Sequence, residues 1–196
     1  MTLRSLAISL ILLVACSSSH SDVSGSGTIA GVGFTAIAGI ASGPLAAGEV
    51  CGATADGGVA CVSTGQESLT VTFTNKASFA CGDSASNFAL LDTLVVNVTE
   101  GGSIGPGSYA IGTGANGASA AFSTTTASCG NGVTSAATGG SVTVTSMAGG
   151  HVSGNVSLMF GSSPFTGTFD VESCTSADGG PPPDAGLPIN VTTCER

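Results

Sequence analysis

The sequence predicts an all-β protein, an antiparallel β-sandwich that ends in a C-terminal three-stranded meander. Several segments alternate apolar residues with small or hydroxyl-bearing ones at a period of two, as half-buried strands do. Gly, Pro and Asn, which favour turns, separate these segments at short intervals. No stretch repeats its apolar positions every 3.6 residues over three turns, as an amphipathic helix does. Two packed antiparallel sheets are the architecture that such a pattern favours.

Five strand segments are predicted before the meander. They are residues 28–40, 68–75, 93–99, 109–111 and 118–124, the last two around a Gly-rich turn at 112–117. In the first three segments the apolar side chains of alternate residues are expected to face inward. These residues are Val32, Phe34, Ala36, Leu69, Val71, Phe73, Leu94, Val96 and Val98.

Residues 141–171 predict the meander. Turns are expected at 148–150, which contains Gly149 and Gly150, and at 162–164, which contains Pro164. The side chains on one face of the three strands are apolar, with Gly154 among them. They are Val142, Val144, Val152, Val156, Leu158, Phe160, Phe165, Phe169 and Val171.

The first fifteen residues have the three parts of an export signal. Arg4 supplies the positive charge, residues 6–14 are apolar apart from one serine, and Ala15 is the small residue that precedes a cleavage site. The apolar run is about half the roughly 20 residues that a permanent transmembrane helix needs. Residues 1–15 are therefore predicted to be a cleaved signal peptide.

The motif Leu13-Val14-Ala15-Cys16 resembles the lipobox of bacterial lipoproteins. The resemblance implies cleavage before Cys16, a diacylglycerol thioether on its sulfur and acylation of the new amino terminus, with palmitate-type chains in the bilayer. Stable anchoring needs more than one chain, and this modification supplies it. Ser17 after the cysteine resembles the outer-membrane sorting pattern of enteric lipoproteins, so the implied location is the cell envelope, at the outer membrane.

Four regions follow from these observations. Residues 1–15 form the lipoprotein signal peptide, residues 16–26 the lipidated cysteine with a flexible Ser-rich tether, and residues 27–174 the β-sandwich domain. Residues 175–196 form a Pro/Gly-rich tail that cannot join a central strand. Cys194 near the terminus predicts that a disulfide pins this tail to the domain.

Net charge excludes one class of partner. Without residues 1–15 the chain keeps twelve acidic residues but only Lys76 and Arg196 as basic ones, a formal charge of −10. Two cations cannot neutralise a run of phosphates, so nucleic acid is excluded, and so is a protein surface that binds anionic lipid head groups. The remaining expected partners are the bilayer, through acylated Cys16, and an unidentified protein or glycan.

The cysteines predict disulfides rather than a metal site. With Cys16 lipidated an even set remains, which in an exported chain indicates three bridges. The set is Cys51, Cys61, Cys81, Cys129, Cys174 and Cys194. Among fifteen connectivities we favour Cys51–Cys61, because residues 56–58 can turn a hairpin, followed by Cys81–Cys129 and Cys174–Cys194. No C-x-x-C occurs, so no metal or other cofactor is predicted.

Two glycine motifs resemble catalytic signatures but lack their structural context. Residues 101–105 match G-x-S-x-G, yet Pro106, Gly107 and another strand follow where a nucleophile elbow needs a helix. Residues 112–117 match G-x-G-x-x-G without a βαβ unit to contain it. Both are interpreted as loops.

Two further sets of side chains suggest alternative functional sites, one catalytic and one for calcium. His151, the one histidine of the predicted domain, could join Asp170 and a serine in a hydrolase site, although nothing in the spacing selects a serine. Asp83, Ser84 and Asn87 could offer oxygens to calcium, but they lack the dedicated loop pattern and suit a turn equally well.

Short patterns in the chain resemble small, uncharacterised β-rich lipoproteins of Gram-negative bacteria. They are residues 27–34 (G-x-I-x-G-x-x-F), 153–158 (S-G-x-V-x-L) and 167–170 (G-x-F-D). The resemblance implies a fold and a location but no activity. We therefore expect a membrane-anchored, non-catalytic binding or structural module, with a hydrolase using His151 and Asp170 as the alternative.

Overall fold

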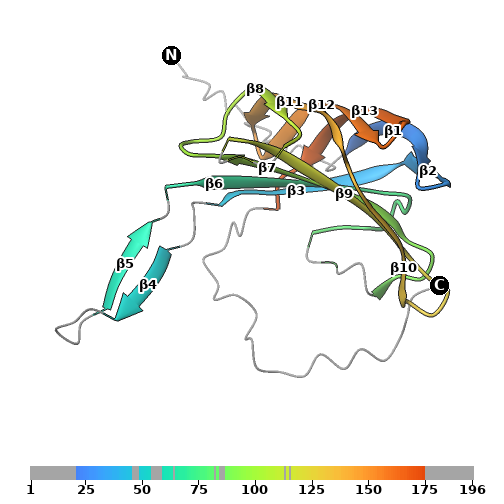
Figure 1. Cartoon of the computed structure of the whole chain (residues 1–196), viewed down its shortest axis with the longest axis horizontal. Coiled ribbons are helices and arrows are strands. Elements are labelled where there is room, and N and C mark those ends of the chain that lie inside the picture. Colours follow the sequence, from blue (N-terminus) through green and yellow to red (C-terminus); the bar gives the residue numbers. More distant parts are fainter. Residues whose placement is uncertain are drawn as a thin grey trace, which may run out of the picture.

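The computed structural model describes residues 21–45, 49–53, 59–63, 65–81, 83, 87–112, 114 and 116–174. Two antiparallel sheets pack face to face, which confirms the predicted β-sandwich (Figure 1). The first sheet contains, in spatial order, β2 (Val32–Ala36), β1 (Asp22–Ile29), β13 (Ser163–Glu172), β12 (His151–Phe160), β11 (Gly139–Ala148) and β8 (Gly107–Ala110). The second contains β10 (Asn131–Ala136), β9 (Gly117–Thr125), β7 (Asp92–Glu100), β6 (Glu67–Thr74) and β3 (Ala38–Leu45). Strands β4 (Glu49–Ala53) and β5 (Val59–Ser63) form a separate hairpin.

The C-terminal meander is present as β11, β12 and β13. Gly149 and Gly150 join the first two strands with φ values of 64° and 79°. Two successive positive φ values are typical of the tight hairpin turn whose twist matches that of the strands, and glycine adopts them without steric cost. The pairing runs from His151 opposite Glu172 to Phe160 opposite Ser163, so β12 and β13 share one uninterrupted register.

The first strand of the domain begins earlier than the sequence predicted. Strand β1 starts at Asp22 and pairs with β13 from Asp22 opposite Asp170 to Gly27 opposite Phe165. Residues 22–26 therefore belong to the sheet, and their assignment to the tether is wrong. Gly25 faces inward, where it leaves room for the ring of Phe165. Residues 22–26 have the Ser/Gly composition of a linker, yet they form a strand. The apolar side chain that packs against this strand, Phe165, belongs to β13.

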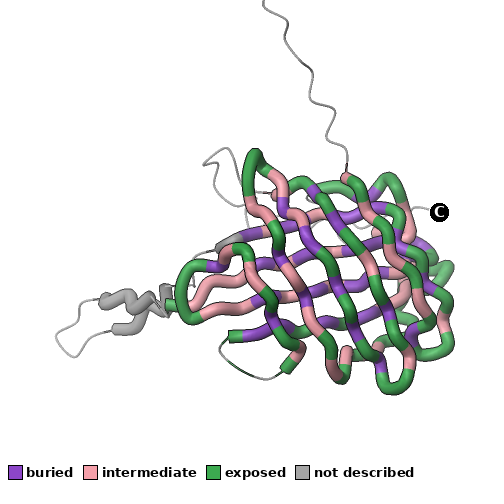
Figure 2. The backbone as a smooth tube through the Cα atoms, turned by 90° about the horizontal axis from the view of Figure 1, so that it is seen from above, coloured by how far each residue is buried: buried purple, intermediate pink, exposed green. Residues whose placement is uncertain are grey.

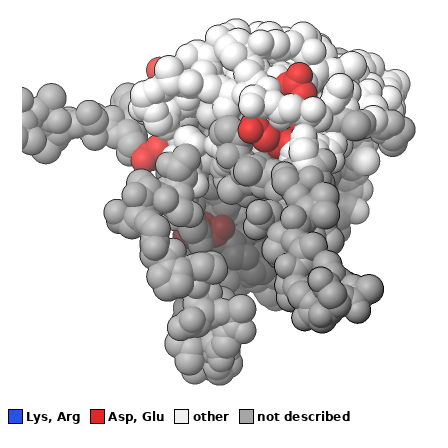
Figure 3. All heavy atoms as spheres, turned by 90° about the vertical axis from the view of Figure 1, so that its left-hand side faces the viewer, with Lys and Arg blue, Asp and Glu red and all other residues white. Residues whose placement is uncertain are grey.

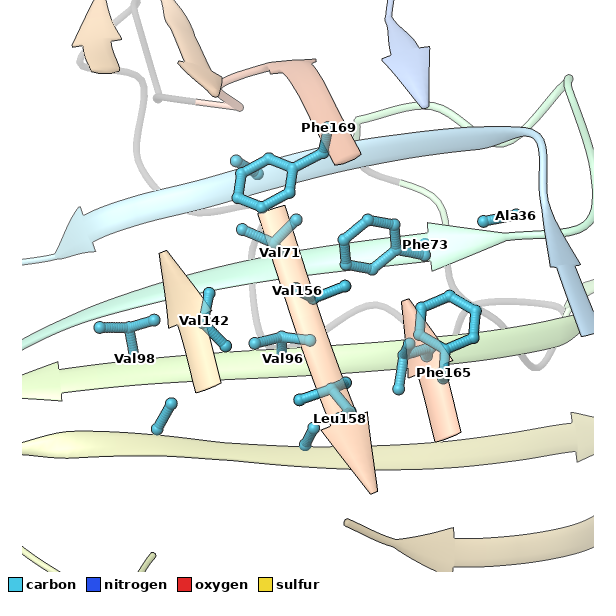
Figure 4. Packing of buried hydrophobic residues seen from close by; sticks show 14 of the residues in the cluster. Ala36, Val71, Phe73, Val96, Val98, Val142, Val156, Leu158, Phe165 and Phe169 are labelled. Carbon is cyan, nitrogen blue, oxygen red and sulfur yellow. The ribbon is translucent and has the colours of Figure 1, made fainter. Parts of the chain in front are cut away.

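The core fills the space between the two sheets (Figure 4). Along β12 and β13 buried and more accessible residues alternate, and Figure 2 shows this banding across the sheets. Every residue predicted to face the core in the meander and in segments 68–75 and 93–99 is buried. Phe34 contacts both Phe122 and Phe165, with ring centroids 5.3 and 5.6 Å apart, and Phe73 meets Phe169 edge-on at 5.7 Å. The Phe34–Phe122 and Phe73–Phe169 pairs join the two sheets, whereas Phe34 and Phe165 lie in the same sheet.

A smaller apolar cluster lies on residues 76–91, between β6 and β7. Phe79, Phe88 and Leu91 are buried there and pack against Ile40 of β3. The rings of Phe79 and Phe88 are 5.7 Å apart. This cluster places the segment that carries Cys81 beside β3.

Candidate functional site

Several chemically active side chains gather where β1 begins, β12 begins and β13 ends. We call this part of the sandwich the β1 end. The register places Asp22 opposite Asp170 and His151 opposite Glu172, and Cys174 lies two residues after the end of β13. On the face drawn in Figure 3, the charged side chains visible among the described residues are carboxylates, with no Lys or Arg. Lys76 is the single Lys or Arg within the described ranges.

His151 and Asp170, the two residues of the hydrolase alternative, are in contact. His151 Nδ1 lies 3.2 Å from Asp170 Oδ1, and the two side chains are 35% and 54% exposed. Adjacent strands bring them together: Ser153 pairs with Asp170, and His151 lies two residues before Ser153 on the same face. An exposed pair of this kind contributes about 0–1 kcal/mol to stability.

No described serine completes a triad at this pair. Within the described ranges the His151 ring makes no other hydrogen bond, so its second nitrogen reaches no serine hydroxyl. A Ser–His–Asp site needs the nucleophile within hydrogen-bond distance of that nitrogen. The structure therefore supplies a base and its orienting carboxylate on the surface, without an activated nucleophile among the residues it describes.

Two hollows flank the last residues of β13. One, of about 330 Å³, is lined by Ser21, Gly39, Ile40, residues 77–81 and Glu172. The other, of about 390 Å³, is lined by Gly43, Ile104, residues 147–152 and Ser173. Between them Ser173 Oγ donates to Gly43 O at 3.2 Å and Cys174 N donates to Ala41 O at 2.6 Å. The end of β13 is thus fixed to β3 of the opposite sheet.

A disulfide between Cys81 and Cys174 closes the β1 end, with their Cα atoms 5.5 Å apart. The predicted pairings Cys81–Cys129 and Cys174–Cys194 are therefore wrong. The reason is three-dimensional: β3 lies beside both the end of β13 and the segment that carries Cys81. The bridge spans 93 residues, and closing a loop of this size contributes about 4–5 kcal/mol in the chain-entropy model.

The structure also bears on Cys129 and on the predicted Cys51–Cys61 disulfide. Cys129 is also disulfide-bonded. The β4–β5 hairpin has the expected position, with Cys51 directly opposite Cys61 in its register. The pairing Cys51–Cys61 stays a prediction, because residues 56–58 and both side chains lie outside the described residues.

A second carboxylate pair lies where β6 begins and β7 ends. Glu67 stands opposite Glu100 in the register. Ile104 N donates to Glu67 Oε2 at 2.8 Å, while the Tyr109 hydroxyl lies 3.0 Å from Glu100 Oε2 and 2.7 Å from Gly105 O. Burial, and secondarily the Glu100 carboxylate, raise the pKa of Tyr109. These bonds fix residues 101–106 as the loop between β7 and β8.

The two discarded glycine motifs fall between strands. Ser103 of the G-x-S-x-G match is exposed in the loop from β7 to β8, where the next element is a strand and not a helix. The G-x-G-x-x-G match connects β8 to β9, and Thr113 and Ala115 within it lie outside the described residues. Neither loop has the strand–helix context that its motif requires.

The calcium alternative has no support in the described residues. Asp83 Oδ2 accepts a hydrogen bond from Ala80 N at 2.8 Å, and Asp83 N donates to Ala80 O at 3.1 Å, so Asp83 closes a turn. Ser84 lies outside the described residues. In the part of the chain that the structure describes, no three His, Cys, Asp or Glu side chains gather as metal ligands would.

The predicted lipidation site, Cys16, and the tail at 175–196 lie outside the described residues. Among the described residues no helix has the length and apolar character to span a membrane. Searches with the whole chain found no match among protein-family models, curated proteins or solved structures.

Proposed function

We propose that this chain is an exported lipoprotein whose β-sandwich is held at the membrane by acylated Cys16 and serves as a non-catalytic interaction or structural module of the cell envelope. One observation supports it best: β1, paired on both sides, begins at Asp22. Only five residues separate Asp22 from Cys16. Fully extended, that connection reaches about 20 Å, so the anchor holds the β1 end near the bilayer.

The charge of the β1 end supports anchoring by acyl chains. Asp22, Asp170 and Glu172 are acidic and exposed, and no described cation lies among them. Anionic head groups would repel such a surface rather than bind it. The acyl chains of Cys16 would then provide the affinity for the membrane, while the carboxylates keep the domain off the lipid.

The outer face of the first sheet is suited to a neutral polar partner. A shallow hollow of about 470 Å³ crosses β1, β13 and β12 on this face. It is lined by Ser24, Gly25, Ser26, Asn155, Val156, Thr166, Gly167 and Thr168. Ser24 Oγ and Thr168 Oγ1 lie 2.9 Å apart, and none of the lining side chains is charged. Hydroxyl and amide groups in this arrangement favour hydrogen bonds to a glycan or an uncharged protein surface.

Detergent phase partition of the Cys16→Ser variant tests the anchor. We expect the wild-type protein in the detergent phase, and the variant either in the aqueous phase or unprocessed with its signal peptide attached. A matched Ser17→Ala variant keeps the cysteine and should partition like the wild type. Unchanged detergent partition of a processed Cys16→Ser protein would contradict the proposal.

The contact between His151 and Asp170 favours a hydrolase as the second candidate function. It predicts that a fluorophosphonate probe labels a serine of the purified protein and that His151→Ala abolishes the labelling. The non-catalytic proposal predicts no labelling of either protein. Labelling that depends on His151 would replace our first proposal with the second.

A further inference from the structure

One apolar side chain on the surface is held in an unfavourable position. Leu90 is 63% exposed, the most exposed large hydrophobic residue in the described ranges. Together with Lys76, Ala89 and Ala127 it lines a hollow of about 330 Å³. We call these four residues the Leu90 patch. The patch lies between the two segments that connect β6 to β7 and β9 to β10.

The backbone keeps Leu90 pointing outward. Its φ is 53°, in the left-handed region, which costs a residue with a Cβ about 1–2 kcal/mol. Leu90 N donates to Thr126 O at 3.3 Å, and Asn75 Nδ2 donates to Leu90 O at 3.4 Å. Leu90 thus combines backbone strain with an exposed apolar side chain. Both features are typical of binding sites.

The adjoining segment carries a disulfide. Cys129 lies two residues after Ala127, its N–H donates to Thr126 O at 3.0 Å, and its φ of 58° is also in the left-handed region. Cys129 is disulfide-bonded, whereas Cys81 is bonded to Cys174. Whatever cysteine binds Cys129 is therefore brought to the edge of the Leu90 patch.

A candidate partner for Cys129 follows by elimination. Cys51 and Cys61 stand opposite each other in the β4–β5 register, and their predicted pairing with one another is the first premise. Cys16 is used by the lipid, a step that rests on the proposed function. Cys194 is the cysteine that remains, and the nineteen residues between it and Cys174 allow the two cysteines to lie up to about 65 Å apart. That exceeds the span of a 150-residue domain, whose radius of gyration is about 15 Å.

We propose that residues 187–193 dock on the Leu90 patch and that a Cys129–Cys194 disulfide holds them there. Leu187, Ile189 and Val191 alternate with other residues immediately before Cys194, as an extended segment with one apolar face requires. Glu195 follows the cysteine, and Lys76 of the patch makes no ion pair within the described residues. The patch and the segment are therefore complementary in both hydrophobicity and charge.

Non-reducing peptide mapping of the full-length protein tests the covalent part. We expect one cross-linked peptide that contains Cys129 and Cys194. A Cys129 peptide linked to Cys51 or Cys61 would overturn this inference alone, and a link to Cys16 would overturn the lipid anchor as well. A free, unacylated Cys16 beside an intact Cys129–Cys194 link would contradict only the anchor.

Hydrogen exchange of residues 187–193 in the full-length protein tests the docking. We expect amide exchange at least about tenfold slower than in an unstructured peptide, independent of protein concentration. Leu90→Ser should remove this protection, and Ile189→Ser should do the same from the other side of the contact. Met159→Ser, on an exposed residue of β12 in the other sheet, is the matched control and should change nothing.

Three results would overturn the docking. Residues 187–193 could exchange without protection in the wild-type protein. Protection could survive both Leu90→Ser and Ile189→Ser. Protection could also increase with protein concentration, which would place a second copy of the chain on the patch.

Discussion

The ring of Phe165 occupies the space that a side chain at Gly25 would need. A Cβ added to Gly25 would lie 2.8 Å from Phe165 Cζ, closer than such atoms approach in proteins. Gly25 belongs to the first strand and Phe165 to the last, so this contact joins the two ends of the described domain. The glycine is therefore a core residue of β1 rather than part of a flexible tether.

We expect Gly25→Ala to lower the free energy of unfolding by about 1–3 kcal/mol, because the added methyl overpacks the core against Phe165. Gly33→Ala on the neighbouring β2 is the control, since nothing lies within 4 Å of a Cβ at that position. It should leave stability unchanged or raise it by up to about 1 kcal/mol. Denaturant titration compares the two variants, and equal losses would show that Phe165 does not lie against β1.

The sequence was most informative where one face of a strand is buried. Leu69, Val71 and Phe73 alternate with threonines, and the period of two alone predicts which residues face the core. The same reasoning missed β10, because five of its six residues are exposed and no apolar face is visible. It also missed residues 22–26, where serine and glycine carry no hydrophobic signal and the apolar partner belongs to β13.

Contacts between distant segments could not be predicted from spacing. The pairing of Cys81 with Cys174 depends on how β3 lies beside both segments, and fifteen connectivities are possible for six cysteines. The sequence suggests His151 and Asp170 as a possible pair. Only the three-dimensional structure shows that the two side chains touch across β12 and β13 and that no described serine joins them.

The two faces of β13 should respond differently to mutation. Phe169 is 2% exposed and contacts Phe73, so Phe169→Ala should lower the free energy of unfolding by about 3–5 kcal/mol. Thr168 points to the outer face and bonds to Ser24, and Thr168→Ala should cost about 1 kcal/mol or less. Chemical denaturation of both variants measures the difference. Comparable losses would mean that a partner or another part of the chain covers the outer face.

Asp92 should make stability depend on pH with an unusual sign. Partial burial raises the pKa of its carboxyl group above the ordinary value of 3.8. Because the folded state then holds the proton more tightly than the unfolded state, Asp92 opposes folding above its folded pKa. This opposition is relieved as the pH falls through the folded pKa toward the unfolded value.

The Asp92→Asn variant isolates this effect. The amide oxygen of the new residue can still accept the hydrogen bond that Asn75 Nδ2 makes to Asp92 Oδ2 at 3.0 Å. We expect the stability of the variant relative to the wild type to be higher at pH 7 than at pH 3. Unfolding free energies at the two pH values measure it, and a relative stability that is higher at pH 3 would show that the pKa of Asp92 is lowered instead.

Mass spectrometry of the N-terminal peptide from membrane-extracted protein tests the lipid anchor most directly. We expect a peptide that begins at Cys16 and carries a diacylglycerol thioether together with an acylated amino terminus. A peptide that begins at another residue, or one that contains Cys16 with a free or disulfide-bonded sulfur, would contradict the proposal that this β-sandwich is a lipoprotein.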